Sequence, residues 1–197
     1  MKRLVLFDIG GVLLKLYIPE FFKTLADRSP KAADTAAVRE FFQKSGVEDE
    51  YHDGKLSEES FLRKLKKLFV LTESIDKIGE IYRDRLGGPI AETIDLKKRL
   101  AESGITVGLL SNTSREDTLY LSEKYPEIYE TFGGPKIFSF EVGASKPNPI
   151  IYEIVPECKD ITFIEDTPRN LEIPKQRGWK TFIYPDQSNK ILSLVGA

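Results

Sequence analysis

The chain has 197 residues, of which 41% are hydrophobic and 30% charged, and its formal net charge is −2. This composition is typical of a globular protein rather than a disordered one, and the small net charge argues against a nucleic-acid or anionic-membrane binder. No apolar run approaches the roughly 20 residues of a membrane span. The single cysteine, Cys158, excludes a disulfide within the chain and favours a reducing compartment, so we expect a cytoplasmic location.

Residues 3–7 form an almost unbroken apolar run, which predicts a strand buried on both faces of a parallel sheet. Asp8 follows this run directly, and Gly10 and Gly11 come next. In open α/β sheets, chemistry is concentrated beyond the carboxyl ends of the strands. An aspartate there can attack phosphorus as a nucleophile and bind a metal ion. Because Asp and Gly are also common turn residues, Asp8 needs partners from other strand ends before it can be considered catalytic.

Residues 18–87 carry apolar positions at helical spacing and predict a small helical subdomain inserted after the first strand. Ser57 is expected to be the N-cap of one of its helices. His52, the only histidine, is expected to have a surface or packing role. Three apolar stripes are expected to pack together: Ala37, Val38, Phe41 and Phe42; Phe61, Leu62, Leu65 and Leu68; and Ile75, Ile78, Ile81 and Tyr82.

From residue 88 onward, helical and strand patterns alternate, which predicts βαβ units. Gly104 is expected just beyond the end of a helix, and Pro174 is expected to kink or shorten another. The fold class is therefore α/β, with a Rossmann-like parallel five-stranded sheet flanked by helices, built from residues 1–17 and 88–197. The expected helices are 89–103, 115–131 with a break near Pro126, one from about 149, and 168–177; the further strands are 105–110, 136–140, 161–165 and 180–184.

Polar residues follow each core strand, and parallel pairing would bring them to one edge of the sheet. Ser111 and Asn112 with Lys146 are candidates for phosphate binding, and Lys146 supplies a positive charge. Glu165 and Asp166, together with Asp8 and the backbone carbonyl of Gly10, are candidate Mg²⁺ ligands. Each has an ordinary explanation alone, as a helix cap, a solvated charge or a turn. Their order, one set after each strand, favours a single site in which Asp8, Ser111 and Lys146 are catalytic.

Four segments carry these residues: FDIGGVLL, GLLSNTS, GASKPNPIIYE and TFIEDTPRN. Together they resemble the four motifs of the haloacid dehalogenase (HAD) superfamily of hydrolases, and the insert resembles the helical cap of one large subclass. With KYPEIYETF, they are also similar to a branch of sugar-phosphate phosphatases that includes glucose-1-phosphate phosphatases. The resemblance implies a Mg²⁺-dependent phosphatase that acts on a small phosphorylated molecule through an aspartyl-phosphate on Asp8.

Gly10 is the main departure from this resemblance, because most phosphatases of the family carry a second aspartate there. That side chain gives general acid–base help worth roughly 100- to 10,000-fold. Two alternatives therefore stay open. A metal-independent dehalogenase is opposed by the acidic pair Glu165 and Asp166, and a non-catalytic binding or scaffold protein is supported by Gly10. The natural substrate and the oligomeric state, monomer or homodimer, are not indicated by the sequence.

Overall fold

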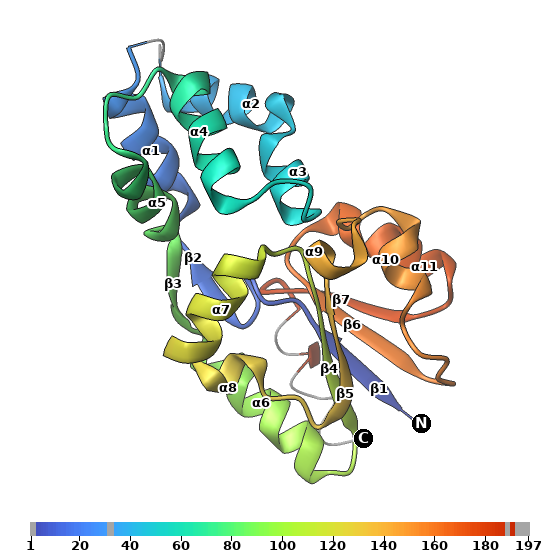
Figure 1. The fold of residues 1–197 in the computed structure, drawn as a ribbon. Helices are drawn as coiled ribbons and strands as arrows, with labels where there is room; N and C mark the ends of the chain where they lie inside the picture. The colour runs from blue at the N-terminus through green and yellow to red at the C-terminus, as the bar shows by residue number, and fades with distance from the viewer. Residues whose placement is uncertain (1–2, 31–33, 188–189, 192–197) are drawn as a thin grey trace.

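The computed structural model describes residues 3–30, 34–187 and 190–191 (Figure 1). Expectations that fall on residues 1–2, 31–33, 188–189 and 192–197 lie outside the described residues. In chain order the elements are β1 (Leu4–Phe7), β2 (Leu14–Leu16), α1 (Ile18–Arg28), α2 (Thr35–Ser45), α3 (Val47–His52), α4 (Glu58–Phe69), α5 (Ile75–Arg83), β3 (Leu86–Pro89), α6 (Ala91–Glu102), β4 (Thr106–Ser111), α7 (Arg115–Lys124), α8 (Pro126–Tyr129), β5 (Gly133–Phe138), α9 (Ser139–Val142), α10 (Pro149–Glu153), β6 (Ile161–Glu165), η1 (Pro168–Leu171), α11 (Glu172–Gln176) and β7 (Lys180–Ile183).

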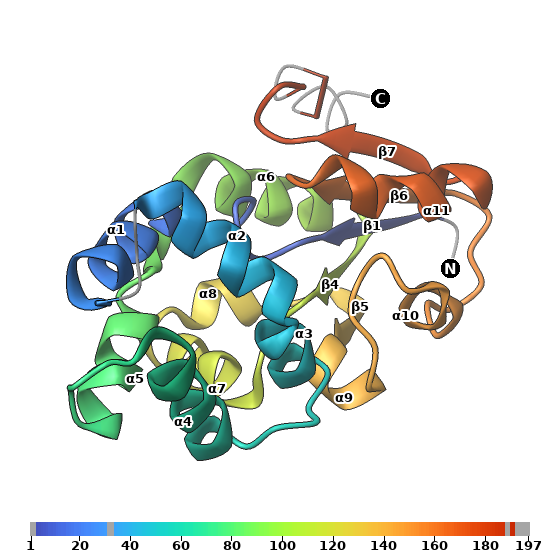
Figure 2. The same ribbon diagram turned by 90° about the horizontal axis from the view of Figure 1, so that it is seen from above.

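Five strands form one parallel sheet in the order β5-β4-β1-β6-β7, which confirms the predicted fold class (Figure 2). The first strand lies at the centre because its residues are apolar on both faces. Val5 and Phe7 pack into a cluster under α6, α7 and α8, whereas Leu4 and Leu6 pack into a second cluster under α10 and η1. Two helical layers thus enclose the sheet, and the carboxyl ends of its strands face the side on which α1–α5 lie (Figure 1).

Helices α1–α5 form a separate group beyond those strand ends (Figure 1). They enclose a hydrophobic cluster of their own, in which Phe42 and Phe61 are almost fully buried. Ser57 caps α4 by accepting a hydrogen bond from the backbone N–H of Ser60, as predicted. All five helices lie within residues 18–87, and we refer to them as the cap; the boundaries of this domain stay a prediction.

The stripe predicted for α2 is wrong in part. Val38 and Phe42 face the cap core, but Ala37 and Phe41 are exposed. Residues four apart lie on the same helix face, whereas their preceding neighbours are turned about 100° away. Phe41 keeps one edge-on contact, with the ring of Phe69 at 6.0 Å.

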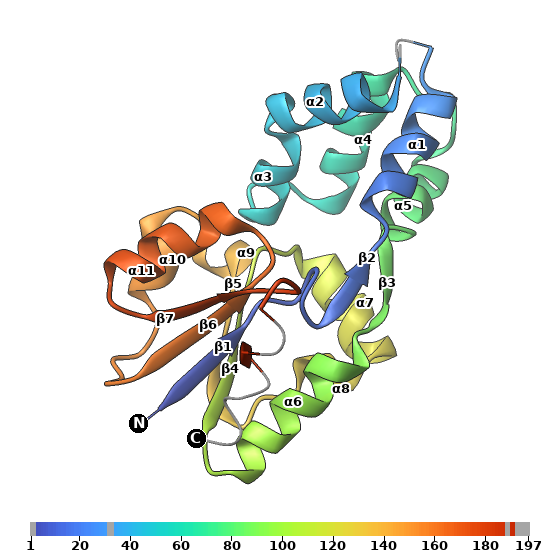
Figure 3. The same cartoon turned by 180° about the vertical axis from the view of Figure 1, so that it is seen from behind.

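The short antiparallel pair β2–β3, which was not predicted, joins the sheet to the cap (Figure 3). β3 contains Pro89, which was predicted to begin a helix; α6 begins at Ala91 instead. Gly87 permits the close pairing, because a Cβ at this position would lie 2.8 Å from the carbonyl oxygen of Lys15. Both passages of the chain between core and cap therefore run through one ribbon.

The other predicted core elements are observed with shifted ends. β5 begins at Gly133 and ends at Phe138, so Phe140, predicted in a strand, lies in α9. Gly134 belongs to this edge strand because it lies against the backbone of Val107, where a Cβ would come within 2.3 Å of the carbonyl oxygen. Gly104 has φ +77° beyond α6, as expected for its position. The break before Pro126 is also confirmed.

The helix predicted over 168–177 is divided into η1 and α11. Pro174 is the third residue of α11, in a first turn where the backbone N–H has no partner within the helix. The proline is thus accommodated by a new helix start rather than by a kink. Within the described residues, no helix combines the length and apolarity needed to cross a membrane.

Lys97 is fully buried on α6 and binds the last turn of α8 and the residue that follows this helix. Its Nζ donates to the carbonyl oxygens of Glu127 (2.6 Å), Ile128 (2.8 Å) and Glu130 (2.8 Å). Carbonyls at a helix end have no partner within the helix, so this ammonium satisfies groups that burial would otherwise leave unpaired.

We predict that Lys97→Met lowers the free energy of unfolding by about 2–3 kcal/mol, because it leaves one buried and two partly buried carbonyl oxygens without this donor. Lys98→Met is the matched control, since Lys98 is the exposed neighbour on the same helix. Urea unfolding of both variants measures the difference. Equal stability of the two variants would show that the three hydrogen bonds contribute nothing net.

Candidate active site

Asp8 lies one residue beyond β1 and is 7% exposed. Its backbone N–H donates to the carbonyl oxygen of Ile164 at 2.9 Å, which continues the pairing of β1 with β6 past the end of the strand. This bond fixes the direction of the Asp8 side chain at the edge of the sheet. The central strand therefore carries the candidate nucleophile into a buried position between its two neighbours.

Lys146 is the cation of the site and is 3% exposed. Its Nζ lies 3.0 Å from Oδ1 of Asp8 and 2.6 Å from Oε2 of Glu165, and it donates to the carbonyl oxygen of Leu110 at 3.0 Å. Burial alone would lower the pKa of Lys146, but the charges of Asp8 and Glu165 raise it, so the side chain stays protonated. The ammonium thus holds together groups from the ends of β1, β4 and β6.

Glu165 is fully buried, and hydrogen bonds reach both of its carboxylate oxygens. Oε2 accepts from Lys146, and Oε1 accepts from the backbone N–H groups of Asp166 (3.2 Å) and Thr167 (3.0 Å). These bonds hold the turn after β6 and fix the position of Lys146.

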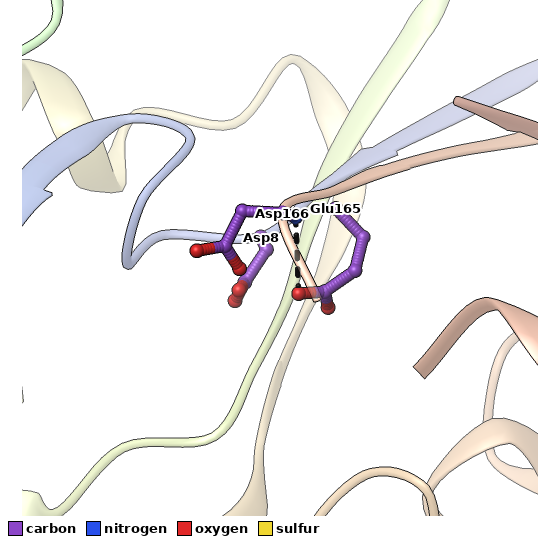
Figure 4. Close-up of side chains that lie close together, drawn as sticks. All are labelled: Asp8, Glu165 and Asp166. Carbon is purple, nitrogen blue, oxygen red and sulfur yellow. Dashed lines mark hydrogen bonds between the residues drawn. The ribbon is translucent and has the colours of Figure 1, made fainter. Parts of the chain in front are cut away.

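The carboxylates of Asp8, Glu165 and Asp166 gather at the ends of β1 and β6 (Figure 4), with one oxygen of each lying within 4.8 Å of the others. The backbone at Gly11 passes close to this group: its φ is +72°, and a Cβ there would come within 2.1 Å of Oδ2 of Asp166. Gly10 is less restricted, because a Cβ there would meet only the flexible end of Leu16, at 3.0 Å. Three clustered oxygen donors fit a hard divalent cation such as Mg²⁺.

The electrostatics of the three carboxylates agree with such a site. The pKa of Asp8 is raised from 3.8 to about 7, because burial and then the charge of Glu165 outweigh the opposite effects of Lys146 and Ser111. The pKa values of Glu165 and Asp166 are also raised, mainly by burial. One lysine does not balance three carboxylates, so a bound cation would stabilise their charged forms.

The predicted phosphate-binding residues Ser111, Asn112 and Lys146 lie close together, and their role stays a prediction. Ser111 is 1% exposed at the end of β4. Its hydroxyl stabilises the charged form of Asp8 and so lowers the pKa of that carboxyl group, against the larger effect of burial. Asn112 instead uses its side chain on the backbone of Lys146: Nδ2 donates to the carbonyl oxygen at 2.9 Å, and Oδ1 accepts from the N–H at 2.7 Å. These two hydrogen bonds hold the loop that carries Lys146 against the end of β4.

The cap touches this site through the end of α3. The hydroxyl of Ser139 donates to the carbonyl oxygen of His52 at 2.6 Å, and that of Ser145, next to Lys146, donates to Oδ1 of Asp53 at 2.6 Å. Tyr51 adds a third contact, donating to Oε2 of Glu116 at 3.0 Å. These hydrogen bonds dock the end of α3 on the loops that carry Ser111 and Lys146.

Between cap and core lies a cavity of about 180 Å³, which we call the interdomain cavity. Sequence reasoning missed several groups in its walls. Arg85 and Asp117 are both buried there and form an ion pair between the end of the cap and α7. Arg85 also donates to the carbonyl oxygen of Tyr82 at 2.7 Å. Charged residues scattered singly along the chain gave no pattern from which this pairing could be found. The walls comprise Ile9, Gly10, Leu14, Leu16, Ile18, Glu48, His52, Arg85, Leu86, Ser111, Asn112, Thr113, Asp117 and Leu121.

Comparisons with known proteins decide the family. Residues 2–178 match the haloacid dehalogenase-like hydrolases. The chain belongs to this family. It is also 24% identical over 198 aligned positions to a D-ribitol-5-phosphate phosphatase of Bacteroides thetaiotaomicron, an alignment that covers 92% of this chain and 91% of that protein.

Solved structures of HAD proteins share this fold. A HAD-like family hydrolase from Porphyromonas gingivalis has a TM-score of 0.75 and 22% identity, with 100% of this chain and 99% of that chain covered. A HAD family enzyme from B. thetaiotaomicron, in complex with magnesium and inorganic phosphate, has a TM-score of 0.71 and 21% identity, with 93% and 94% covered. At these identities the structural likeness shows the fold alone.

We predict that Asp8→Asn stabilises the metal-free protein at pH 8. Because the folded-state pKa of Asp8 is raised from 3.8 to about 7, its ionisation destabilises the fold as the pH rises between these values. Three pKa units correspond to at most about 4 kcal/mol. Thermal unfolding in EDTA at pH 8 and at pH 4 measures the effect, which should nearly vanish at pH 4. If Asp8→Asn is less stable than wild type at pH 8, ionisation of buried Asp8 does not destabilise the folded protein, and the prediction is wrong.

The two glycines allow a matched comparison. Gly11→Ala forces a Cβ onto Asp166 at a positive φ, so we expect a loss of about 1–3 kcal/mol in unfolding free energy, together with weaker Mg²⁺ binding by calorimetry. Gly10→Ala meets only a movable leucine methyl group and should change both quantities little. The expectation fails if the two alanine variants behave alike.

Proposed function

We propose that this chain is a Mg²⁺-dependent phosphatase that hydrolyses a small phosphorylated metabolite through an aspartyl-phosphate on Asp8. The observation that carries the proposal is Lys146, which holds Asp8 against Glu165 while Asp166 completes an acidic group within 4.8 Å. A nucleophilic carboxylate, a fixed positive charge and a metal-binding group are what phosphoryl transfer to an aspartate requires.

In this proposal the metal-binding group consists of Asp8, Asp166 and the backbone carbonyl of Gly10, with Glu165 as the third carboxylate. When bound, Mg²⁺ would neutralise charge on the transferring phosphoryl group. The chain's own residues supply the remainder. Lys146 holds one Asp8 oxygen by an ion pair and would place a positive charge beside the phosphoryl oxygens, and Ser111 offers a hydroxyl donor at the end of β4.

The interdomain cavity supports a small polar substrate, a sugar or polyol phosphate. Its volume of about 180 Å³ is small, and its walls combine charged and hydroxyl groups with leucines. The relative from B. thetaiotaomicron is named for a linear pentitol phosphate, which agrees with this class. The expected branch of glucose-1-phosphate phosphatases, the cytoplasmic location and a monomeric or homodimeric state also stay proposals.

Asp8→Asn should abolish hydrolysis of 4-nitrophenyl phosphate, because the amide is not a nucleophile towards phosphorus. Loss of an essential nucleophile removes several orders of magnitude in rate. Wild type is assayed with Mg²⁺ and with EDTA, and we expect turnover only with the metal. Asp95→Asn, a change of the same kind on the exposed face of α6, is the control and should keep full activity.

Activity of Asp8→Asn within about ten-fold of wild type, or about 1.4 kcal/mol in barrier, would refute the covalent mechanism. Halide release from 2-haloacids without metal would favour the dehalogenase instead. If the folded wild-type protein turns over neither class of compound, the non-catalytic scaffold is the correct alternative.

A further inference from the structure

Gly10 leaves the proposed reaction without a proton donor at the position that usually supplies one. Departure of a sugar or polyol alkoxide needs a proton, and general acid help is worth roughly 100- to 10,000-fold. A donor must lie where the leaving group lies. Since Gly10 itself lines the interdomain cavity, the other titratable groups in the walls of this cavity are the ones to consider.

Four such groups lie in these walls: Glu48, His52, Arg85 and Asp117. Arg85 and Asp117 are bound to each other in a buried ion pair, and a guanidinium does not give up its proton in proteins. Glu48 is already engaged, because its Oε1 accepts a hydrogen bond from the hydroxyl of Tyr82 at 2.9 Å. His52 is the group whose side-chain class both donates and accepts protons at neutral pH.

The surroundings of His52 suit a proton donor. Tyr82 gives its single hydroxyl hydrogen to Glu48, so its oxygen can only accept from Nε2 of His52, which lies 3.4 Å away. This arrangement places a hydrogen on Nε2 and connects the imidazole through Tyr82 to the negative charge of Glu48. Among the described residues, the structure shows no hydrogen bond at the other ring nitrogen, Nδ1, which is thus free for a substrate.

The backbone of His52 is fixed against the catalytic side of the core. Its carbonyl oxygen accepts from Ser139, and the hydroxyl of Ser139 also accepts from the backbone N–H of Thr113 at 3.0 Å. Thr113 is two residues beyond Ser111, in the loop expected to bind phosphate. His52, which lines the interdomain cavity, is thus held against the segment that follows Ser111.

We propose that His52 is the proton donor to the leaving group, in place of the aspartate that Gly10 lacks; this inference rests on the proposed phosphatase function. Asp8 attacks phosphorus, the bond from phosphorus to the alkoxide oxygen breaks with its electron pair going to oxygen, and Nδ1–H of the imidazolium protonates that oxygen. Neutral His52 then takes a proton from the water that attacks phosphorus. The bond from phosphorus to Asp8 breaks, inorganic phosphate leaves, and the imidazolium is restored.

The test compares two leaving groups. The aryl substrate is 4-nitrophenyl phosphate, whose nitrophenolate leaves without a proton. The alkyl substrate is the one of ribitol 5-phosphate, glucose 1-phosphate and glycerol 3-phosphate that wild type hydrolyses fastest. His52→Gln keeps an amide donor for Tyr82 but has no transferable proton, so we expect kcat on the alkyl phosphate to fall by about 100-fold, and kcat on the aryl phosphate to change little.

A second variant supplies the rescue. Gly10→Asp in the His52→Gln background restores a carboxyl group at the usual position, and Gly10 has no positive φ that would strain it. We expect this double variant to recover alkyl phosphate turnover, whereas Gly10→Asn with His52→Gln does not. The kcat values of Glu48→Gln on the alkyl and aryl phosphates are measured as well, in order to distinguish the role of Glu48 from that of His52.

The proposal is overturned if His52→Gln lowers kcat on both substrates equally, raises only KM, or leaves alkyl turnover intact. It is also overturned if Glu48→Gln alone shows the dependence on leaving group. Thermal unfolding establishes that each variant is folded, and His52→Asn replaces His52→Gln if the latter is not. Failure of the phosphatase function is distinguished by wild type itself, which would then show no Asp8-dependent hydrolysis of the aryl phosphate.

Discussion

The burial of one lysine beside two carboxylates is the constraint on which the site depends. Removing an ammonium from water costs several kcal/mol unless charges and hydrogen bonds replace the hydration. For Lys146 the replacements come from Asp8, Glu165 and the carbonyl of Leu110, which lie at the ends of three adjacent strands. They reach one ammonium only when β4, β1 and β6 pair in this order and register. The fold and the candidate site are therefore specified by the same pairing.

That relation explains how much of both could be predicted from the sequence. A parallel sheet brings the residue after each strand to one edge, so recognising the strands also places Asp8, Ser111 and Asp166 near one another without any knowledge of side-chain contacts. The direction of a side chain at that edge does not follow from this rule. Asn112 has the expected position, but its amide is satisfied by the backbone of Lys146.

The features that were missed depend on contacts between segments far apart in the chain. β2 and β3 are too short for a periodic signal, and each is a strand only because the other lies beside it. Arg85 and Asp117 form a buried pair across 32 positions of sequence. His52 lies in a cavity wall because Ser139 binds its backbone across 87 positions. Local pattern carries no information about such pairings, and a lone histidine is more often a packing residue.

The cap is attached to the core more strongly at the ribbon β2–β3 than at α3. On the ribbon side the two parts are joined covalently twice and share the buried pair Arg85–Asp117. On the α3 side they meet through hydrogen bonds of Tyr51, His52 and Asp53, which water can replace at a net cost of about 1 kcal/mol each. The buried members of the cap's apolar cluster all lie within residues 21–82, so the core contributes none of them. Separation of cap and core would therefore cost less free energy on the α3 side than at the ribbon β2–β3.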